Sequence, residues 1–203
     1  YHCTDLFYGM NLYRAFVELE PLLRSDPAQY AAQLTDFLER EAWITPPDYH
    51  KMRFLGNHDT VSWVWQSARA ADCYGTGAAK ALFALISLMD GVPMIYQGDE
   101  DPSIYGGTGE NLTKYFTALF GHRKAFIPEG NSTEWLHTNT PVMAFIRQGS
   151  VMVLINLSDR IQEYDFAGRQ VRLLASTESG QGAEDSLTLG RIPAYGYQIV
   201  RCL

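Results

Sequence analysis

Positive charge is scarce in this sequence. Sixteen lysines and arginines stand against 23 aspartates and glutamates, which gives a formal net charge of −7. A protein with a net negative charge repels phosphate backbones, and the sequence has no dense cluster of lysines and arginines that would overcome this repulsion. We therefore predict that nucleic acid is not a partner. A neutral, hydroxyl-rich ligand is one of many that this charge allows.

Cysteines and long hydrophobic runs are also few. The three cysteines (Cys3, Cys73 and Cys202) lie far apart, without the spacing of a metal-binding motif. An odd number cannot pair completely, so three unpaired thiols are expected. The longest apolar run, residues 78–89, has the length of a buried helix and is too short to span a bilayer. No membrane segment is therefore predicted.

The sequence begins at Tyr1, without an initial methionine or a visible signal peptide. Such a start predicts a fragment or a processed product of a longer protein. The localisation of that parent protein stays open between secreted, periplasmic and cytoplasmic.

Strand-like and helical patterns alternate along the first two-thirds of the chain. Residues 1–10 contain a candidate strand, and residues 52–56 and 92–98 are two short apolar segments that each end in polar residues. Helical patterns separate the three. Strands and helices that alternate with short connections are typical of parallel βα units.

Three of the helical patterns carry clear local signals. Asp26 can cap a helix whose first position is Pro27. The segment from Gly75 is apolar nearly all round, which predicts a helix buried on most sides, and Gly91 can end it. The helix expected over residues 112–124 has basic residues in its last turn, where cations are favoured.

The pattern changes near residue 130 to short strands separated by turn residues. Residues 142–148 and 150–157 predict a hairpin that turns near Gly149. About seven such strands predict a small antiparallel β-sandwich. The expected fold class is α/β plus all-β, with one domain at residues 1–130 and another at residues 131–203.

The stretch FLGNHDT, residues 54–60, ends an apolar run with an amide, an imidazole and a carboxylate. One interpretation is a turn in which the Asx side chains bond to local backbone. The other is a functional site, because loops at the carboxyl ends of parallel strands carry the chemistry in β/α folds. The next apolar segment ends at Asp99 and Glu100, so two neighbouring strands would bring polar groups to one rim.

FLGNHDT, followed by GVPMIYQGDE at residues 91–100, resembles the α-amylase superfamily of retaining glycoside hydrolases. The two segments are similar to those that follow barrel strands seven and eight of that family. Residues 142–158 and 192–200 resemble its C-terminal β-domain. The resemblance implies part of a (β/α)8 TIM barrel, about strands six to eight, followed by the antiparallel β-sandwich.

The resemblance also assigns roles to the polar triplet. Retaining cleavage of a glycosidic bond needs a nucleophile and an acid/base carboxyl group around an oxocarbenium-like transition state. The family adds a third catalytic carboxylate after strand seven, which is Asp59 here. His58 would donate to a sugar hydroxyl in the same substrate-binding subsite, and Asn57 would brace the turn. The implied substrate is an oligo- or polysaccharide of the α-glucan class.

The family's other two catalytic carboxyl groups follow strands four and five, which would precede Tyr1. We therefore expect this chain to be inactive alone, with the missing N-terminal part of the barrel as its partner. No cofactor and no metal are expected in it, since His2, His50, His122 and His137 lack metal-like spacing. A Ca²⁺ ion in the complete parent protein stays open.

Two alternatives remain. Some members of the superfamily have lost catalysis and act as scaffolds or interaction partners; the presence of Asp59 argues against this, and the residues that precede Tyr1 would decide. A carbohydrate-binding module, in which only the C-terminal strands matter, predicts exposed aromatic side chains on one face. Few aromatic residues are available there beyond Trp135, Tyr195 and Tyr197.

Overall fold

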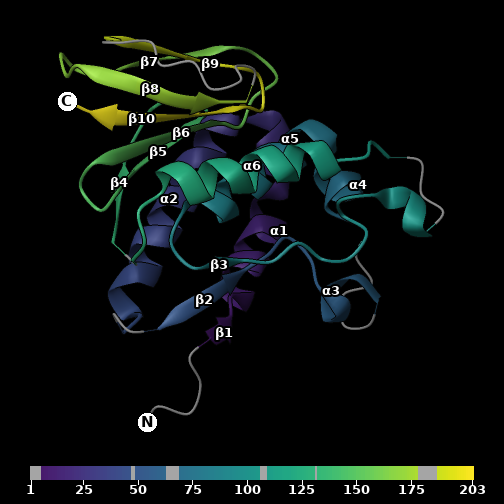
Figure 1. Ribbon diagram of the computed structural model, residues 1–203. Coiled ribbons are helices and arrows are strands. Elements are labelled where there is room, and N and C mark those ends of the chain that lie inside the picture. The colour runs from purple at the N-terminus through teal and green to yellow at the C-terminus, as the bar shows by residue number, and fades with distance from the viewer. Residues whose placement is uncertain (1–5, 47–48, 63–68, 106–108, 131, 178–186) are drawn as a thin grey trace.

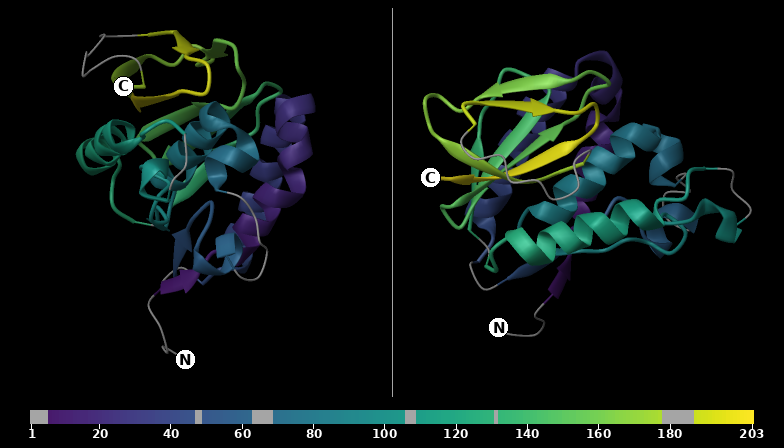
Figure 2. Two further views of the ribbon diagram at one scale, coloured as in Figure 1. Left: turned by 90° about the vertical axis from the view of Figure 1, so that its right-hand side faces the viewer. Right: turned by 45° about the horizontal axis from the view of Figure 1, so that its top comes forward.

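The computed structural model of the protein has helices between two sheets (Figure 1). It describes residues 6–46, 49–62, 69–105, 109–130, 132–177 and 187–203. Parallel strands lie at one end of the molecule and antiparallel strands at the other, and two further views show the same layering (Figure 2).

The parallel sheet has three strands in the order β1–β2–β3, with bounds Leu6–Tyr8, His50–Arg53 and Val92–Pro93. Between β1 and β2 lie α1 (Met10–Ser25) and α2 (Pro27–Ile44). Between β2 and β3 lie α3 (His58–Ser62), α4 (Ala70–Tyr74) and α5 (Thr76–Leu88). The alternation of parallel strands with helices is thus present.

One strand is shorter than the sequence suggests. Residues 92–98 were expected to form a strand, but β3 ends at Pro93, which has no N–H to donate to a sheet. The chain then turns, with the Asp99 N–H donating to the Tyr96 carbonyl at 2.9 Å and Gly98 at a φ of 96°. The expectation of a longer strand was therefore wrong.

The antiparallel region follows η1 (Pro102–Tyr105) and α6 (Thr113–Phe126). Its larger sheet has the order β4–β5–β6–β10–β8, with bounds Thr133–Leu136, Val142–Arg147, Val151–Asn156, Tyr197–Cys202 and Val171–Ser176. The strands β7 (Gln162–Asp165) and β9 (Leu189–Ile192) pair as a separate ribbon. The predicted hairpin is confirmed as β5 and β6, which pair from Val142 with Asn156 to Arg147 with Val151.

The five-stranded sheet is buried on both faces. All six residues of β5 and all six of β6 are buried. One face, including Phe145 and Val153, shares a core with α2, α5 and α6, and the other, including Ala144 and Leu154, packs against the ribbon. The C-terminal region is therefore antiparallel and β-rich, as expected. Because one core crosses residue 130, the division into domains at residues 1–130 and 131–203 stays a prediction.

Helix α5 is buried because it lies between the sheets, in contact with β6 on one side and β3 on the other. Ten of its 13 residues are buried, as the apolar sequence predicts. Gly91 follows it with a φ of 97°, a conformation that favours glycine. Arg123 of α6 donates to the carbonyls of Ser87, Met89 and Gly91 and so satisfies the end of α5.

The N-terminus of α2 also matches its sequence signal. The Asp26 carboxylate accepts the Gln29 N–H at 3.0 Å, and Pro27 takes the first helical position. Within the described residues, no helix has both the length and the apolar character needed to cross a membrane.

Candidate functional site

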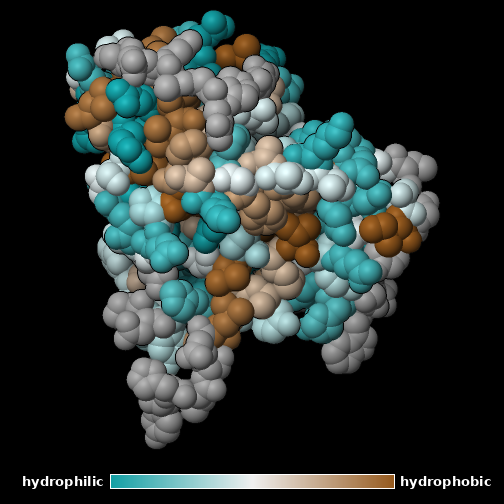
Figure 3. Space-filling model, in the orientation of Figure 1, coloured by the Kyte–Doolittle hydropathy of each residue, from teal (hydrophilic) through white to brown (hydrophobic). Residues whose placement is uncertain are grey.

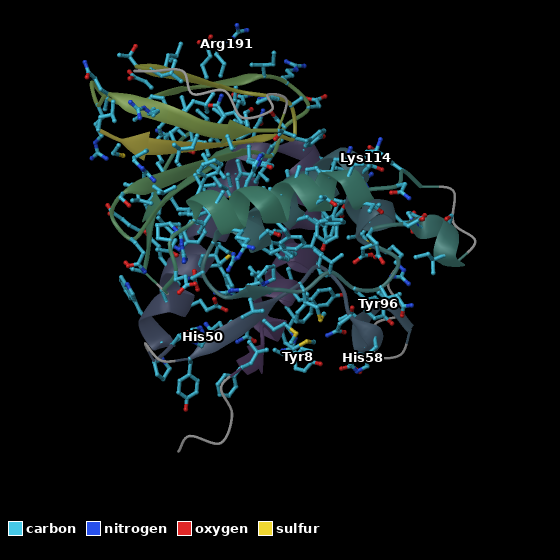
Figure 4. All side chains as sticks on the ribbon, in the orientation of Figure 1. Tyr8, His50, His58, Tyr96, Lys114 and Arg191 are labelled. Atoms are coloured by element: carbon cyan, nitrogen blue, oxygen red, sulfur yellow. The ribbon has the colours of Figure 1, made fainter. Side chains whose placement is uncertain are left out.

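The carboxyl ends of the three parallel strands meet at one edge of their sheet. Tyr8 ends β1, the triplet of Asn57, His58 and Asp59 follows β2, and Tyr96 follows β3. Figure 4 shows Tyr8, His58 and Tyr96 toward this edge, with His50 at the opposite end of β2. Three consecutive strands thus bring polar side chains to a common rim, as the sequence predicts for the last two.

Asn57 builds the turn that carries its two neighbours. Its side-chain oxygen accepts the N–H groups of Asp59 and Thr60, each at 3.0 Å, and so caps α3. The Thr60 hydroxyl accepts the Asn57 N–H in return, at 2.8 Å. This reciprocal arrangement satisfies three backbone donors where the helix begins. The interpretation of Asn57 as a turn residue is therefore confirmed.

The Asn57 side chain is fully buried, at 0% exposure. Its side-chain nitrogen has no hydrogen-bond partner among the described residues. The geometry gives Asn57 a bracing role, and its place in a substrate-binding subsite stays a prediction.

His58 and Asp59 occupy the first turn of α3, above the buried Asn57. Their side chains are 64% and 35% exposed, and His58 Nε2 lies 3.2 Å from Asp59 Oδ1. A carboxylate in the first turn also meets the positive end of the helix. The pair therefore presents an imidazole and a carboxylate to solvent, on a turn that hydrogen bonds between the Asn57 side chain and the backbone hold in place.

The loop after β3 is tied to the start of α4 by Arg69, which no motif in the sequence singles out. Arg69 Nη1 lies 3.6 Å from Asp99 Oδ1, and the same nitrogen donates to the Gln97 carbonyl. The guanidinium stands 4.9 Å from the centre of the Tyr96 ring. The signal available in the sequence was an arginine just before α4, and nothing local links it to residues 96–99.

Asp99 and Glu100 anchor this loop. Burial raises the pKa of Asp99 to about 6, against the opposing effect of Arg69. Glu100 accepts the Gly98 N–H at 2.8 Å. Both carboxylates therefore have local partners, which gives them a structural role in this loop.

The cap offers a test of the site's framework. Asn57→Ala removes both acceptor bonds at the start of α3, and we expect the free energy of unfolding to fall by about 1–2 kcal/mol. Asn57→Ser keeps a short acceptor and should lose clearly less. Urea unfolding of both variants measures the difference, and equal losses in the two would contradict the capping role.

Comparisons with known proteins identify the fold of the chain. No protein-family model and no curated protein matches the sequence. Among solved structures, the α-amylase from H. orenii matches 98% of this chain and 49% of its own, at 17% identity and a TM-score of 0.69. The fold is that of the α-amylases. A maltogenic α-amylase from Thermotoga neapolitana matches 100% of this chain and 52% of its own, at 16% identity and a TM-score of 0.69.

The α-amylase fold extends to related enzymes. The isomaltulose synthase from Protaminobacter rubrum matches 87% of this chain and 46% of its own, at 16% identity and a TM-score of 0.60. The chain spans about half the length of these structures. The chain therefore shares the fold of about half of each of these structures.

Proposed function

We propose that this chain is the C-terminal part of an α-amylase-like glycoside hydrolase that acts on α-glucosidic linkages by a retaining mechanism. The observation that carries the proposal is the position of Asp59 beside His58 at the carboxyl edge of the parallel strands, in a chain with the α-amylase fold. In this proposal β1, β2 and β3 are strands six to eight of a (β/α)8 barrel, and the antiparallel region is the C-terminal β-sandwich.

Asp59 acts as the third carboxylate of the reaction. Its carboxylate accepts a hydrogen bond from a sugar hydroxyl of the substrate. Hydrogen bonds to such hydroxyls strengthen in the oxocarbenium-like transition state. His58, with 64% of its side chain exposed, donates to a hydroxyl of the same sugar. Asn57 holds both residues in place through the cap of α3.

The nucleophile and the acid/base come from an N-terminal part of the barrel. Within the described residues, β1 and β3 are the two outer strands of the parallel sheet, on either side of β2. Figure 3 shows apolar surface between α6 and the parallel strands, and Val92 of β3 is 43% exposed. A parallel sheet that ends in two outer strands and carries exposed apolar surface supports a partner that completes the barrel. The chain alone is therefore inactive in this proposal.

The carbohydrate-binding module is the weaker alternative. It requires exposed aromatic side chains on the antiparallel sheet, but Trp135 is 7% exposed and Tyr197 only 2%. Trp135 packs on Phe145 at 4.8 Å between ring centres, and the Tyr197 hydroxyl pairs with His122. Trp135 and Tyr197, two of the three candidate aromatic residues, are therefore buried and do not form an exposed binding face.

The test is hydrolysis of a malto-oligosaccharide, followed by NMR of the anomeric protons. We expect the complete protein to release the α-anomer first, because double displacement retains configuration. We expect the 203-residue chain to release no product. Initial release of the β-anomer would overturn the retaining mechanism, and an inactive complete protein would favour the scaffold alternative.

A further inference from the structure

A cluster of ligating side chains lies away from the parallel sheet, where α2 meets the loop after β4. Asp36 and Glu39 belong to α2, and His137 directly follows β4. One ligand atom from each of the three lies within 4.8 Å of the others. His137 Nε2 is 3.0 Å from Glu39 Oε2, and His137 Nδ1 is 3.8 Å from Asp36 Oδ1.

The charge of this cluster is not balanced by its surroundings. Within the described part of the chain, neither Asp36 nor Glu39 forms an ion pair with a lysine or an arginine, and His137 is the partner of both. A neutral imidazole leaves two negative charges side by side. A divalent cation would neutralise them, and it would replace the repulsion between the carboxylates with two attractive contacts.

Both sides of the cluster stand on ordered backbone. Asp36 and Glu39 are spaced i, i+3, which puts them on one face of α2. The neighbouring Leu38 is buried in the core that also holds Trp135 of β4. After His137 the chain is fixed by the Thr138 hydroxyl, which donates to the Val142 carbonyl at 2.6 Å. The fold therefore brings the three ligands together, although Glu39 and His137 lie 98 positions apart in the sequence.

The mixture of donors decides which cations fit. Ca²⁺ and Mg²⁺ prefer oxygen ligands only, whereas Zn²⁺ takes imidazole nitrogen together with carboxylate oxygen. We propose that Asp36, Glu39 and His137 form a binding site for one divalent cation of the zinc class, which joins α2 to the loop after β4. Three protein ligands leave one tetrahedral position for water. The sequence shows no metal motif because such motifs depend on ligands that lie close together along the chain, whereas these three ligands come from distant segments.

The test is calorimetric titration of the protein with ZnCl₂ in a buffer that does not bind zinc, with a phosphine reductant present. We expect a saturable site of one-to-one stoichiometry that depends on His137. His137→Ala should weaken Zn²⁺ binding by at least ~10- to 100-fold, since losses of that size already follow removal of residues that only orient a metal ligand. Asp36→Asn and Glu39→Gln should each weaken it as well. MgCl₂ should bind much more weakly than ZnCl₂.

His50→Ala is the matched control, because His50 is an exposed histidine outside the cluster. It should leave the affinity for Zn²⁺ unchanged, and Zn²⁺ should raise the melting temperature of this variant but not of folded His137→Ala. Binding that His137→Ala leaves intact would overturn the proposal, as would the lack of a saturable site in the unsubstituted protein. Equal affinity for Mg²⁺ and Zn²⁺ would reduce the cluster to an acidic surface and would overturn it too.

Discussion

Asp59→Asn is expected to lower the kcat of the complete enzyme by at least ~100-fold, or about 2.7 kcal/mol, and to change KM little. Asparagine keeps the shape of the side chain and one acceptor but removes the charge. If Asp59 stabilises the transition state more than the bound substrate, the loss appears in kcat. A role in binding both states equally would instead raise KM.

Steady-state kinetics on an α-glucoside measures the effect, with circular dichroism to check the fold. Asp72→Asn is the matched control, because Asp72 is also an acidic residue in the first turn of a five-residue helix. It should keep kcat within a few-fold of the unsubstituted enzyme. His58→Ala should cost less than Asp59→Asn, since it removes one neutral hydrogen bond. A folded Asp59→Asn enzyme with nearly full kcat would make Asp59 a turn residue and remove the basis of the proposed function.

Local signals in the sequence predicted local structure well. Asp26 and Pro27 start α2 where the sequence places them, and the hairpin of β5 and β6 turns near Gly149 as expected. Each of these features depends on a few neighbouring residues, whose caps, turns and apolar pattern suffice to define it. The segment before α3 belongs to the same class, since Asn57 and Thr60 bond to each other across three residues.

Contacts between distant segments were not predictable in this way. Arg69 meets Asp99 across 30 positions, and the ligands around His137 come from two parts of the chain. The sequence suggested a second sheet against the first beyond residue 130, but it did not show that a two-stranded ribbon would cover one face of the five-stranded sheet and helices the other. The apolar runs of β5 and β6 indicate burial on both faces but do not say what covers each face.

Arg53 shows the same limit, and its replacement has the second-largest expected effect. In the sequence it interrupts the apolar segment at residues 52–56, and its side chain is 2% exposed in the structure. Its guanidinium lies 2.6 Å from Glu41 of α2 and 3.0 Å from Asp90, which follows α5. Arg53 therefore links β2 to α2, which precedes it in the sequence, and to the end of α5, which follows it.

Arg53→Met is expected to lower the free energy of unfolding by about 3 kcal/mol, the lower end of the range for breaking a buried ion pair. Methionine fills much of the volume but leaves the carboxylate of Glu41, 7% exposed, without its closest cation. Two features limit the loss: Lys51 remains 3.2 Å from Glu41, and a cavity of 460 Å³ borders the cluster and can admit water.

The measurement is urea unfolding of Arg53→Met beside Arg24→Met. Arg24 pairs with Glu20 at 3.1 Å, but its side chain is 66% exposed, so its removal should cost less than about 1 kcal/mol. The same substitution at the two sites thus separates the cost of leaving buried carboxylates unpaired from the cost of losing an arginine. Adding Glu41→Gln to Arg53→Met should recover part of the stability, because it removes the buried negative charge that Arg53→Met leaves without its partner. Equal, small losses at the two arginines would mean that solvent in the adjoining cavity already screens the cluster and that Arg53 does not hold the helices to β2.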